Sequence, residues 1–542
     1  MHKPLSNSVK CLLGILLFVL SSQVVFSQSL VRKFDVTAGG SGSEYPKKLI
    51  RTSNKRFVFV APSSSSTSPF KSEPNRDITL ATYDYWVVCF DSLGAIVWER
   101  TFGGTGNDIP TTVVELNGGG FLVGGYSDSP VSGEKSEACR GGIDFWFLRL
   151  SATGQLLWEK TWGGNSFDQL SDLSVSASGE VFAVGTSLSG VSGDKTSAAY
   201  GSFDFVMAVF NLNGQFLFDR TYGSTLNDNC YAIAYNGNGG FLLSGLSDSP
   251  AGFTKSQNAR GLYDFWMIKI DSTGKKLWDL TQGGTSEDYG YACRYKDGFY
   301  YVGGDSYSPA GLDKTAANKG ACDYWVIKVK DAGTKMWDRS FGGNDVDELR
   351  QIDFTSNGKL LIGGSSYSSV NNDKTEGNLG VEQIWLVVAD TGGNKLFDKT
   401  FFSPGHDEDG LVVEMNPGTY IGVVNSSCST GGYKTQDSLG MGDVWICGLS
   451  PAVSGVEDLN SENQVRVYPN PLVGEQISVE SVEPFEWIEL LSAENKILLH
   501  QVNTNNTLEI QLAIGNITPG IYFLRLGNKH QTVTKKIVVV NN

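Results

Sequence analysis

One short pattern, a polar residue followed by two large apolar residues, recurs seven times along the chain. Its copies are Asp84-Tyr85-Trp86, Asp144-Phe145-Trp146, Asp204-Phe205-Val206, Asp264-Phe265-Trp266, Asp323-Tyr324-Trp325, Gln383-Ile384-Trp385 and Asp443-Val444-Trp445. Successive copies lie 60, 60, 60, 59, 60 and 60 residues apart. A period this constant is the signature of a repeat architecture, so the sequence predicts seven structural units.

Each unit carries four strand patterns separated by turns. In the second unit they cover residues 109–116, 121–125, 144–150 and 156–162. Four antiparallel strands in about 60 residues are typical of a propeller blade, and neighbouring blades cover each other's apolar faces. We therefore expect an all-β fold with a seven-bladed β-propeller over 28–450, in which the repeated aromatic residues pack between blades rather than form a ligand-binding ladder.

Closure of the ring is also readable. The seventh unit ends after its third strand at 443–449, whereas the segment 30–34 at the other end of the chain resembles a fourth strand. We predict that 30–34 is the outer strand of the seventh blade, which removes a free sheet edge. An all-β solenoid, the alternative, would leave this strand unpaired.

The glycine pairs near the strand ends and the single tryptophan strand of each unit resemble kelch-like propellers and related bacterial propeller repeats. The resemblance covers about residues 28–450. It implies a fold and says little about activity, because such folds host many unrelated functions.

The chain changes character after the repeats. A linker at 451–464 precedes short alternating strands at 465–542, which predict a small Ig-like β-sandwich. Its motif residues are Tyr468, Pro469, Asn470, Pro471, Gly520, Tyr522, Lys535 and Lys536. They resemble the type A C-terminal sorting domain of type IX secretion cargo. The resemblance implies recognition by the outer-membrane translocon and sorting machinery, followed by release or attachment to the cell surface; an ordinary carbohydrate-binding appendage is the alternative.

The first residues are typical of a secretory signal peptide, predicted at 1–27. Lys3 and Lys10 precede an apolar run at 11–20, and small residues lie near Ser27. The run is short for a membrane span, and we expect no transmembrane segment in the mature chain. Together with a sorting domain, this predicts a secreted or outer-membrane cell-surface protein.

The composition limits the partners and cofactors. A formal net charge of −15 and a pI near 4.9 oppose nucleic acid as a ligand, because a polyanion needs a basic surface. Seven cysteines follow the predicted signal peptide without CxxC spacing, which favours buried single residues over a disulfide scaffold or a zinc site. No cofactor is predicted; Ca²⁺ could bind the acidic loops, but none has a recognisable calcium-binding spacing.

Two charged positions recur in every unit. The acids are Glu44, Asp108, Asp168, Asp228, Asp288, Asp347 and Asp407, and the lysines are Lys71, Lys135, Lys195, Lys255, Lys314, Lys374 and Lys434. Both belong to connections on the same face of a blade. We predict structural ion pairs or loop caps, as between Asp108 and Lys135, Asp168 and Lys195, or Asp228 and Lys255, rather than a sevenfold metal or ligand site.

The long loops between the second and third strands mark the face where a ligand would bind. Candidate contacts are loop residues that differ between units: Arg140, Tyr200, Arg260, Tyr307, Lys319 and Tyr367. His406 is the only histidine of the repeats, and we interpret 406–409 as a solvated acidic turn rather than a catalytic base. No catalytic residue is predicted. We expect an exported binding or adhesion module for glycan or protein; the alternative is a polysaccharide-acting propeller enzyme, a glycoside hydrolase or lyase, with paired carboxylates.

Overall fold

The computed structural model describes residues 30–77, 82–451 and 465–540, the last range without 469–471, 473–474, 482–484, 493–495, 504–506, 516 and 528–531. The predicted signal peptide, most of the linker and the motif residues Pro469, Asn470 and Pro471 lie outside the described residues. Every named regular element in the described part is a β-strand. The search of these residues for a helix long and apolar enough to cross a membrane found none. The chain divides into two compact units, 1–450 and 451–542.

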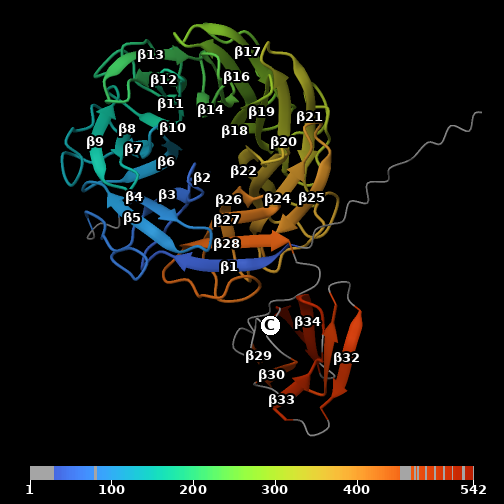
Figure 1. Ribbon diagram of the computed structural model, residues 1–542. Coiled ribbons are helices and arrows are strands. Elements are labelled where there is room, and N and C mark those ends of the chain that lie inside the picture. Colours follow the sequence, from blue (N-terminus) through green and yellow to red (C-terminus); the bar gives the residue numbers. More distant parts are fainter. Residues whose placement is uncertain are drawn as a thin grey trace, which may run out of the picture. The chain divides into compact units, whose positions relative to one another are not determined.

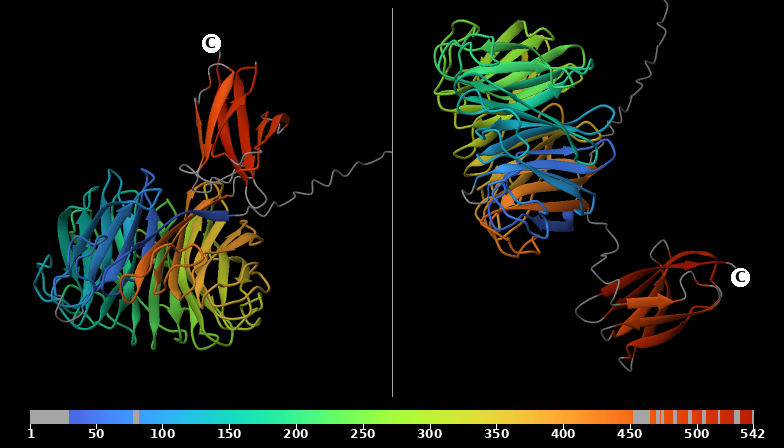
Figure 2. Two further views of the ribbon diagram at one scale, coloured as in Figure 1. Left: turned by 90° about the horizontal axis from the view of Figure 1, so that it is seen from below. Right: turned by 90° about the vertical axis from the view of Figure 1, so that its left-hand side faces the viewer.

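The first unit is a β-propeller. Between Leu30 and Pro451 the described residues form seven four-stranded antiparallel sheets arranged in a ring (Figure 1). In each sheet the strands follow one another from an inner strand beside the axis to an outer edge strand, and Figure 2 shows the sheets edge-on.

The strand bounds of the first six sheets are β2 (Lys48–Arg51), β3 (Phe57–Ser63), β4 (Asp84–Phe90), β5 (Ile96–Phe102); β6 (Asp108–Glu115), β7 (Phe121–Ser127), β8 (Asp144–Leu150), β9 (Leu156–Trp162); β10 (Asp168–Val175), β11 (Val181–Ser187), β12 (Asp204–Phe210), β13 (Phe216–Tyr222); β14 (Asp228–Tyr235), β15 (Gly240–Ser247), β16 (Asp264–Asp271), β17 (Lys276–Gln282); β18 (Asp288–Lys296), β19 (Phe299–Ser306), β20 (Asp323–Lys330), β21 (Lys335–Phe341); β22 (Asp347–Phe354), β23 (Leu360–Ser366), β24 (Gln383–Ala389) and β25 (Lys395–Thr400).

The seventh sheet joins the two ends of the propeller chain. Its strands are β26 (Asp407–Asn416), β27 (Thr419–Ser426), β28 (Asp443–Pro451) and, on the outer edge, β1 (Leu30–Ala38). The carboxylate of Asp35 in β1 accepts hydrogen bonds from the backbone N–H of Thr435 at 2.7 Å and from Nε1 of Trp445 at 3.4 Å. In the first sheet Glu99 of β5 makes the equivalent bonds to Ser72 and Trp86. β1 therefore takes the place of a fourth strand and closes the ring.

The repeated aromatic residues join neighbouring sheets. Trp146 is fully buried, and its ring lies 4.8 Å from that of Tyr85 in the preceding sheet. The hydroxyl of Tyr85 also donates to the backbone oxygen of Trp146 at 3.1 Å. Phe205 and Trp266 repeat this contact at 4.8 Å. Large buried rings thus supply the apolar contacts that one sheet cannot provide by itself.

The second unit consists of two small sheets around one apolar core. Strands β29 (Val465–Tyr468), β30 (Gln476–Ser481) and β33 (Glu509–Ala513) form the first sheet, and β32 (Ile497–Val502), β31 (Trp487–Leu491), β34 (Gly520–Gly527) and β35 (Thr532–Val539) form the second. The core contains Ile477 and Leu512 from the first sheet and Leu490, Leu524 and Ile537 from the second. These two sheets make the C-terminal unit a small β-sandwich.

Candidate ligand-binding site at the channel mouth

The inner strands of six propeller sheets, β6, β10, β14, β18, β22 and β26, share a β-bulge at one place. In β10 the pairing with β11 shifts between Leu170 and Asp172, and in β22 the pairing with β23 shifts between Leu349 and Gln351. In these six strands the bulge falls at or beside the third residue after the repeated acid. Over all seven units this position is occupied by Lys47, Thr111, Ser171, Tyr231, Tyr291, Arg350 and Gly410. A bulge leaves a residue outside the ladder and re-aims its side chain.

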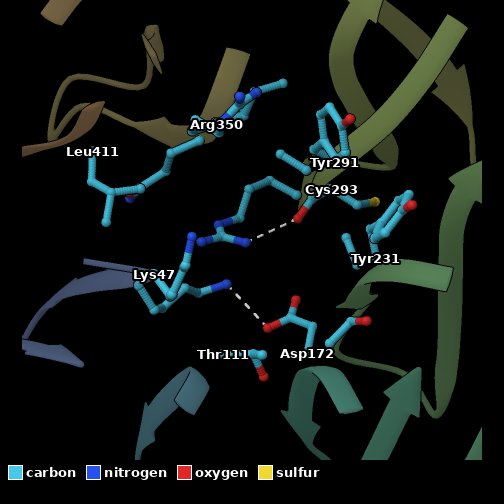
Figure 3. A pocket seen from close by; sticks show the side chains of 15 residues that line it. Lys47, Thr111, Asp172, Tyr231, Tyr291, Cys293, Arg350 and Leu411 are labelled. Carbon is cyan, nitrogen blue, oxygen red and sulfur yellow. Dashed lines mark hydrogen bonds and ion pairs between the residues drawn. The ribbon is translucent and has the colours of Figure 1, made fainter. Parts of the chain in front are cut away.

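All of these residues except Gly410 line one cavity of about 340 Å³. The cavity lies at the beginning of the inner strands. Asp108, the first residue of β6, pairs with Ser127, the last residue of β7, so this end of the channel is the end from which the long loops leave. A smaller space of about 90 Å³ continues from it and is lined by many of the same residues; Figure 3 shows its side chains converging from different sheets.

The side chains that line the channel mouth differ in size and type from one sheet to the next. Thr111 and Ser171 present small hydroxyl side chains. In the next two sheets around the ring, the rings of Tyr231 and Tyr291 lie 5.1 Å apart, and Tyr289 stacks on Tyr291 at 6.0 Å. The small residues leave the space, and the tyrosines supply flat faces and hydroxyl groups that border it.

Arg350 binds three carboxylates at the channel mouth. Its guanidinium donates to Asp409 at 2.7 Å, to Asp305 at 3.2 Å and to Glu348 at 2.5 Å, and lies 5.4 Å from the centre of the Tyr291 ring. Burial raises the pKa of Asp305 to about 7. Burial acts in the same direction on Asp409, but there Lys47 and Arg350 outweigh it and lower the pKa to about 2.

Lys47 completes the charge balance, because its Nζ lies 3.0 Å from Asp409. Deeper in the channel, Lys48 of the first sheet pairs with Asp172 of the third sheet at 3.0 Å. Asp172 is buried, which opposes ionisation, yet Lys48 and Arg294 hold its pKa below the usual value. Cations and carboxylates therefore neutralise one another along the wall, which suits a polar ligand of low net charge.

Three of the loop residues proposed from the sequence are ties between neighbouring sheets. Arg140 pairs with Asp194 at 3.0 Å, Arg260 pairs with Asp313 at 2.7 Å, and Lys319 pairs with Asp373. Each of these three residues also donates its backbone N–H to the aspartate that begins the following strand, which caps the loop. These contacts give the three residues a structural role in the ring.

The three tyrosines proposed with them lie elsewhere on the long-loop face. Tyr200 packs against Phe253 with ring centres 5.0 Å apart, and Tyr307 lies 6.5 Å from Tyr289 beside the mouth. Tyr367 contacts His406, with 3.1 Å between its hydroxyl and Nε2. Tyr307 therefore lies near Tyr289 and Tyr291 at the channel mouth, whereas Tyr200 contacts Phe253 away from it.

The repeated acids and lysines bind different partners, so the predicted ion pairs need correction. This applies to Asp108 with Lys135, Asp168 with Lys195, and Asp228 with Lys255. Asp108 accepts bonds from the backbone of Gly104 at 2.7 Å and the hydroxyl of Ser129 at 2.8 Å. Lys135 donates to Thr161 at 2.6 Å and lies 5.6 Å from the Trp146 ring centre. Both groups hold the loops, in line with the loop caps expected as the other structural possibility, and the two charges interact only at longer range.

The bulge residues were missed as site residues because nothing in a strand pattern reveals a bulge. One signal did exist. At a fixed offset of three from the repeated acid, the seven units carry Lys, Thr, Ser, Tyr, Tyr, Arg and Gly, a wide range for one structural position.

Residues 466–540 match the model of the secretion system C-terminal sorting domain. Regulatory protein FlaEY of Caulobacter vibrioides is 24% identical over 379 residues, which are 64% of this chain and 39% of that protein. The chain thus spans about two fifths of the length of this relative.

Two solved structures show distant similarity. The phage phi92 endosialidase aligns at 10% identity with a TM-score of 0.38, over 89% of this chain and 76% of that one. PorZ of the Porphyromonas gingivalis type-IX secretion system aligns at 10% identity with a TM-score of 0.18, over 94% of this chain and 100% of that one. Scores this low carry no argument about function, and the propeller assignment rests on the sheets themselves.

Proposed function

We propose that this type IX secretion cargo uses its propeller as a glycan-binding module on or outside the cell, with the channel mouth as the binding site. The sorting domain over residues 466–540 engages the type IX secretion machinery, and this route leads to the cell surface or the medium. Tyr468, Gly520, Tyr522, Lys535 and Lys536 are the described motif residues through which we expect that engagement.

The observation that carries the proposal is the pairing of tyrosine faces with polar groups around one cavity. Sugar rings present apolar C–H faces that stack on aromatic rings and hydroxyl groups that bind side chains such as those of Thr111 and Gln169. The volume of about 340 Å³ lies within the range of small-ligand sites, roughly 300–1,000 Å³. The balanced charge around Arg350 favours a neutral or weakly charged glycan over a polyanion.

Two variants of the mature full chain test this site on a glycan array and by titration with the glycan that scores highest. Tyr291→Ala removes one stacking face and should weaken binding by about tenfold. Ser171→Tyr should fill the cavity and abolish binding without loss of stability, because the same bulge position already carries Tyr231 and Tyr291.

Tyr200→Ala is the matched control. Tyr200 also packs against an aromatic ring on the long-loop face, but it lies outside the cavity lining. Binding retained in Tyr200→Ala and lost in Ser171→Tyr supports the channel mouth. Binding that survives both Tyr291→Ala and Ser171→Tyr overturns the proposal, as would a glycan array on which the wild-type chain binds no glycan.

A further inference from the structure

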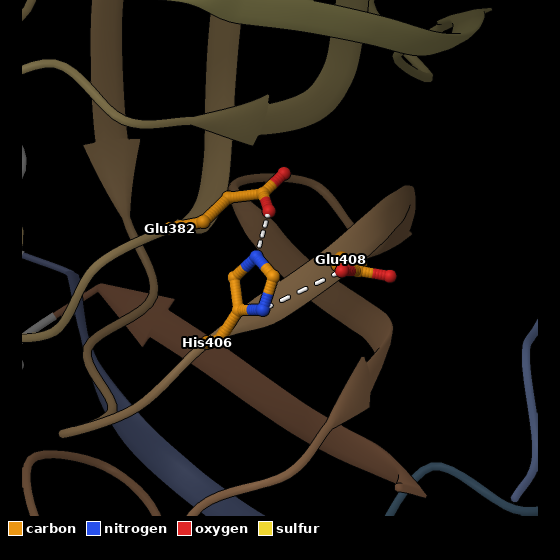
Figure 4. A group of neighbouring side chains, drawn as sticks. All are labelled: Glu382, His406 and Glu408. Carbon is orange, nitrogen blue, oxygen red and sulfur yellow. Dashed lines mark ion pairs between the residues drawn. The ribbon is translucent and has the colours of Figure 1, made fainter.

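A cluster of a histidine and two glutamates stands at the junction of the sixth and seventh sheets. Glu382 precedes β24 and His406 precedes β26, and the two residues form a parallel bridge in which Asp407 donates its backbone N–H to the oxygen of Glu382 at 3.0 Å. Oε2 of Glu382 lies 2.6 Å from Nε2 of His406, and Oε1 of Glu408 lies 3.4 Å from Nδ1 (Figure 4). Each of the three residues offers a ligand atom within 4.8 Å of the others.

The two sides of the imidazole differ in burial. Glu382 has only 3% of its side chain exposed, whereas His406 and Glu408 are 38% and 46% exposed. The short contact to a buried carboxylate favours the tautomer in which Nε2 carries the proton and donates to Glu382. The hydroxyl of Tyr367 also lies on this side of the ring, 3.1 Å from Nε2. Nδ1 is then left with a lone pair that faces the carboxylate of Glu408.

Two electron-rich atoms that face each other repel, and either a proton or a metal ion between them removes this repulsion. The 3.4 Å separation of Nδ1 and Oε1 is longer than a normal N–H···O hydrogen bond of about 2.7–3.2 Å. It matches the distance between two ligands on one tetrahedral zinc ion, about 3.4 Å for bonds near 2.1 Å. A carboxylate that binds the other ring nitrogen is the usual support of a metal-bound histidine, and Glu382 holds that place.

The other junctions show that packing does not require this cluster. The position of His406 is occupied by Ser43, Asn107, Phe167, Asn227, Glu287 and Val346 in the other units, and the position of Glu408 by Tyr45, Ile109, Gln169, Asn229, Tyr289 and Glu348. The parallel bridge persists between Ile143 and Phe167 and between Cys322 and Val346 with apolar side chains. The histidine and its two glutamates are thus a local addition to the repeat.

We propose that His406 and Glu408 bind a divalent transition metal ion of the zinc class at the rim of the channel, with Glu382 as the positioning residue. Imidazole nitrogen selects such ions over Ca²⁺ and Mg²⁺, which prefer oxygen ligands. With two protein ligands, the ion keeps open positions for water or for an oxygen atom of a bound ligand. This metal site is independent of the proposed glycan site.

The test is titration of the chelator-treated mature chain with Zn²⁺ by calorimetry, and with Co²⁺ followed by its visible absorption. The variants come from other units of the same chain: His406→Asn copies Asn107, and Glu408→Gln copies Gln169. We expect one Zn²⁺ site in the wild type, loss of the Co²⁺ spectrum in His406→Asn, and affinity weaker by at least about tenfold in Glu408→Gln and Glu382→Gln.

His500→Asn is the matched control, because His500 also contacts a glutamate, with 3.0 Å between Nδ1 and Oε1 of Glu489. It should bind Zn²⁺ as the wild type does. A wild type that binds no Zn²⁺, or binding that persists in His406→Asn, overturns the proposal. Equal binding of Ca²⁺ and Zn²⁺ also overturns it, because that result points to the acidic surface.

Discussion

The side chains of Gln383 and Asp407 meet at Ser403. Nε2 of Gln383 donates to the hydroxyl of Ser403 at 3.3 Å and to its backbone oxygen, and the hydroxyl in turn donates to Oδ2 of Asp407. At other junctions two carboxyl groups take these places, as with Asp144 and Asp168, which interact through their charges. Oδ1 of Asp144 is buried without a hydrogen-bond partner among the described residues. Asp144 therefore favours its neutral, protonated form. Gln383, which holds the equivalent position in the sixth sheet, is neutral at every pH.

The stability of the propeller should decrease between pH 5 and 7.5. Burial raises the pKa of Asp84 to about 7 and that of Asp144 and Asp264 to about 6. The folded chain therefore keeps protons that the unfolded chain releases near pH 4. The stability due to these groups is complete below pH 4 and is lost as the pH rises through 6 to 7.

Three buried lysines change the stability in the opposite direction at higher pH. Burial lowers the pKa of Lys71, Lys255 and Lys374 to about 8, so between pH 8 and 10.5 the unfolded chain binds more protons and stability rises with pH. Thermal unfolding followed by circular dichroism at constant ionic strength should give the lowest midpoint near pH 7–8. A midpoint that rises steadily from pH 5 to 7.5 would contradict this assignment.

Asp144→Asn should reduce the pH dependence of the free energy of unfolding and leave its value at pH 5.5 almost unchanged. Asparagine still accepts the backbone N–H of Arg140, and like Gln383 it cannot ionise. Asp144→Ala leaves that N–H without its acceptor and should lower the free energy of unfolding by about 1–3 kcal/mol. Urea unfolding at pH 5.5 and 7.5 measures both effects. Asp297→Asn is the control, because the Asp297 side chain is 82% exposed. This substitution should leave the difference in unfolding free energy between pH 5.5 and 7.5 unchanged.

Gly163→Ala should destabilise the junction of the second and third sheets. A Cβ atom at this position would lie 2.3 Å from Oδ1 of Asp144, whose side chain is fully buried, so the junction must shift or strain. We expect a loss of about 1–3 kcal/mol in chemical unfolding. Gly190→Ala meets no atom within 4 Å and should be neutral. Equal stability of the two variants would show that the Gly163 contact is unimportant.

Asp35→Ala should weaken the closure of the ring. The carboxylate of Asp35 binds the backbone and hydroxyl of Thr435, and their loss should cost about 1–3 kcal/mol. The distinctive result is faster proteolysis within 30–38, because only noncovalent contacts hold β1 in the seventh sheet. Asp398→Ala removes the equivalent bond to Thr375 in the sixth sheet, where the fourth strand follows in the chain, and should leave the 30–38 segment protected.

Much of the architecture could be predicted from local signals. The period of 60 residues, with one step of 59, and the alternating strand patterns indicated an all-β propeller, and the motifs after residue 465 indicated the sorting domain. The acid–lysine contacts could not be predicted in detail. Equal loop lengths bring Asp108 and Lys135 to the same face, but whether they touch depends on competing partners such as Ser129 and Thr161.

Local sequence patterns specify the repeat, because apolar periodicity and turn residues act within each unit. The position of the candidate ligand site, in contrast, depends on the assembled ring. Lys47, Tyr231 and Arg350 are far apart in the chain, and they surround one cavity because the closed ring brings the inner strands together. Bulges turn Tyr231 and Arg350 away from the sheet ladders, and Lys47 directly precedes β2. The junction of the sixth and seventh sheets likewise joins Glu382 to His406 across 24 residues. A pattern of strands cannot show such contacts, since bulge direction and blade packing depend on the assembled ring.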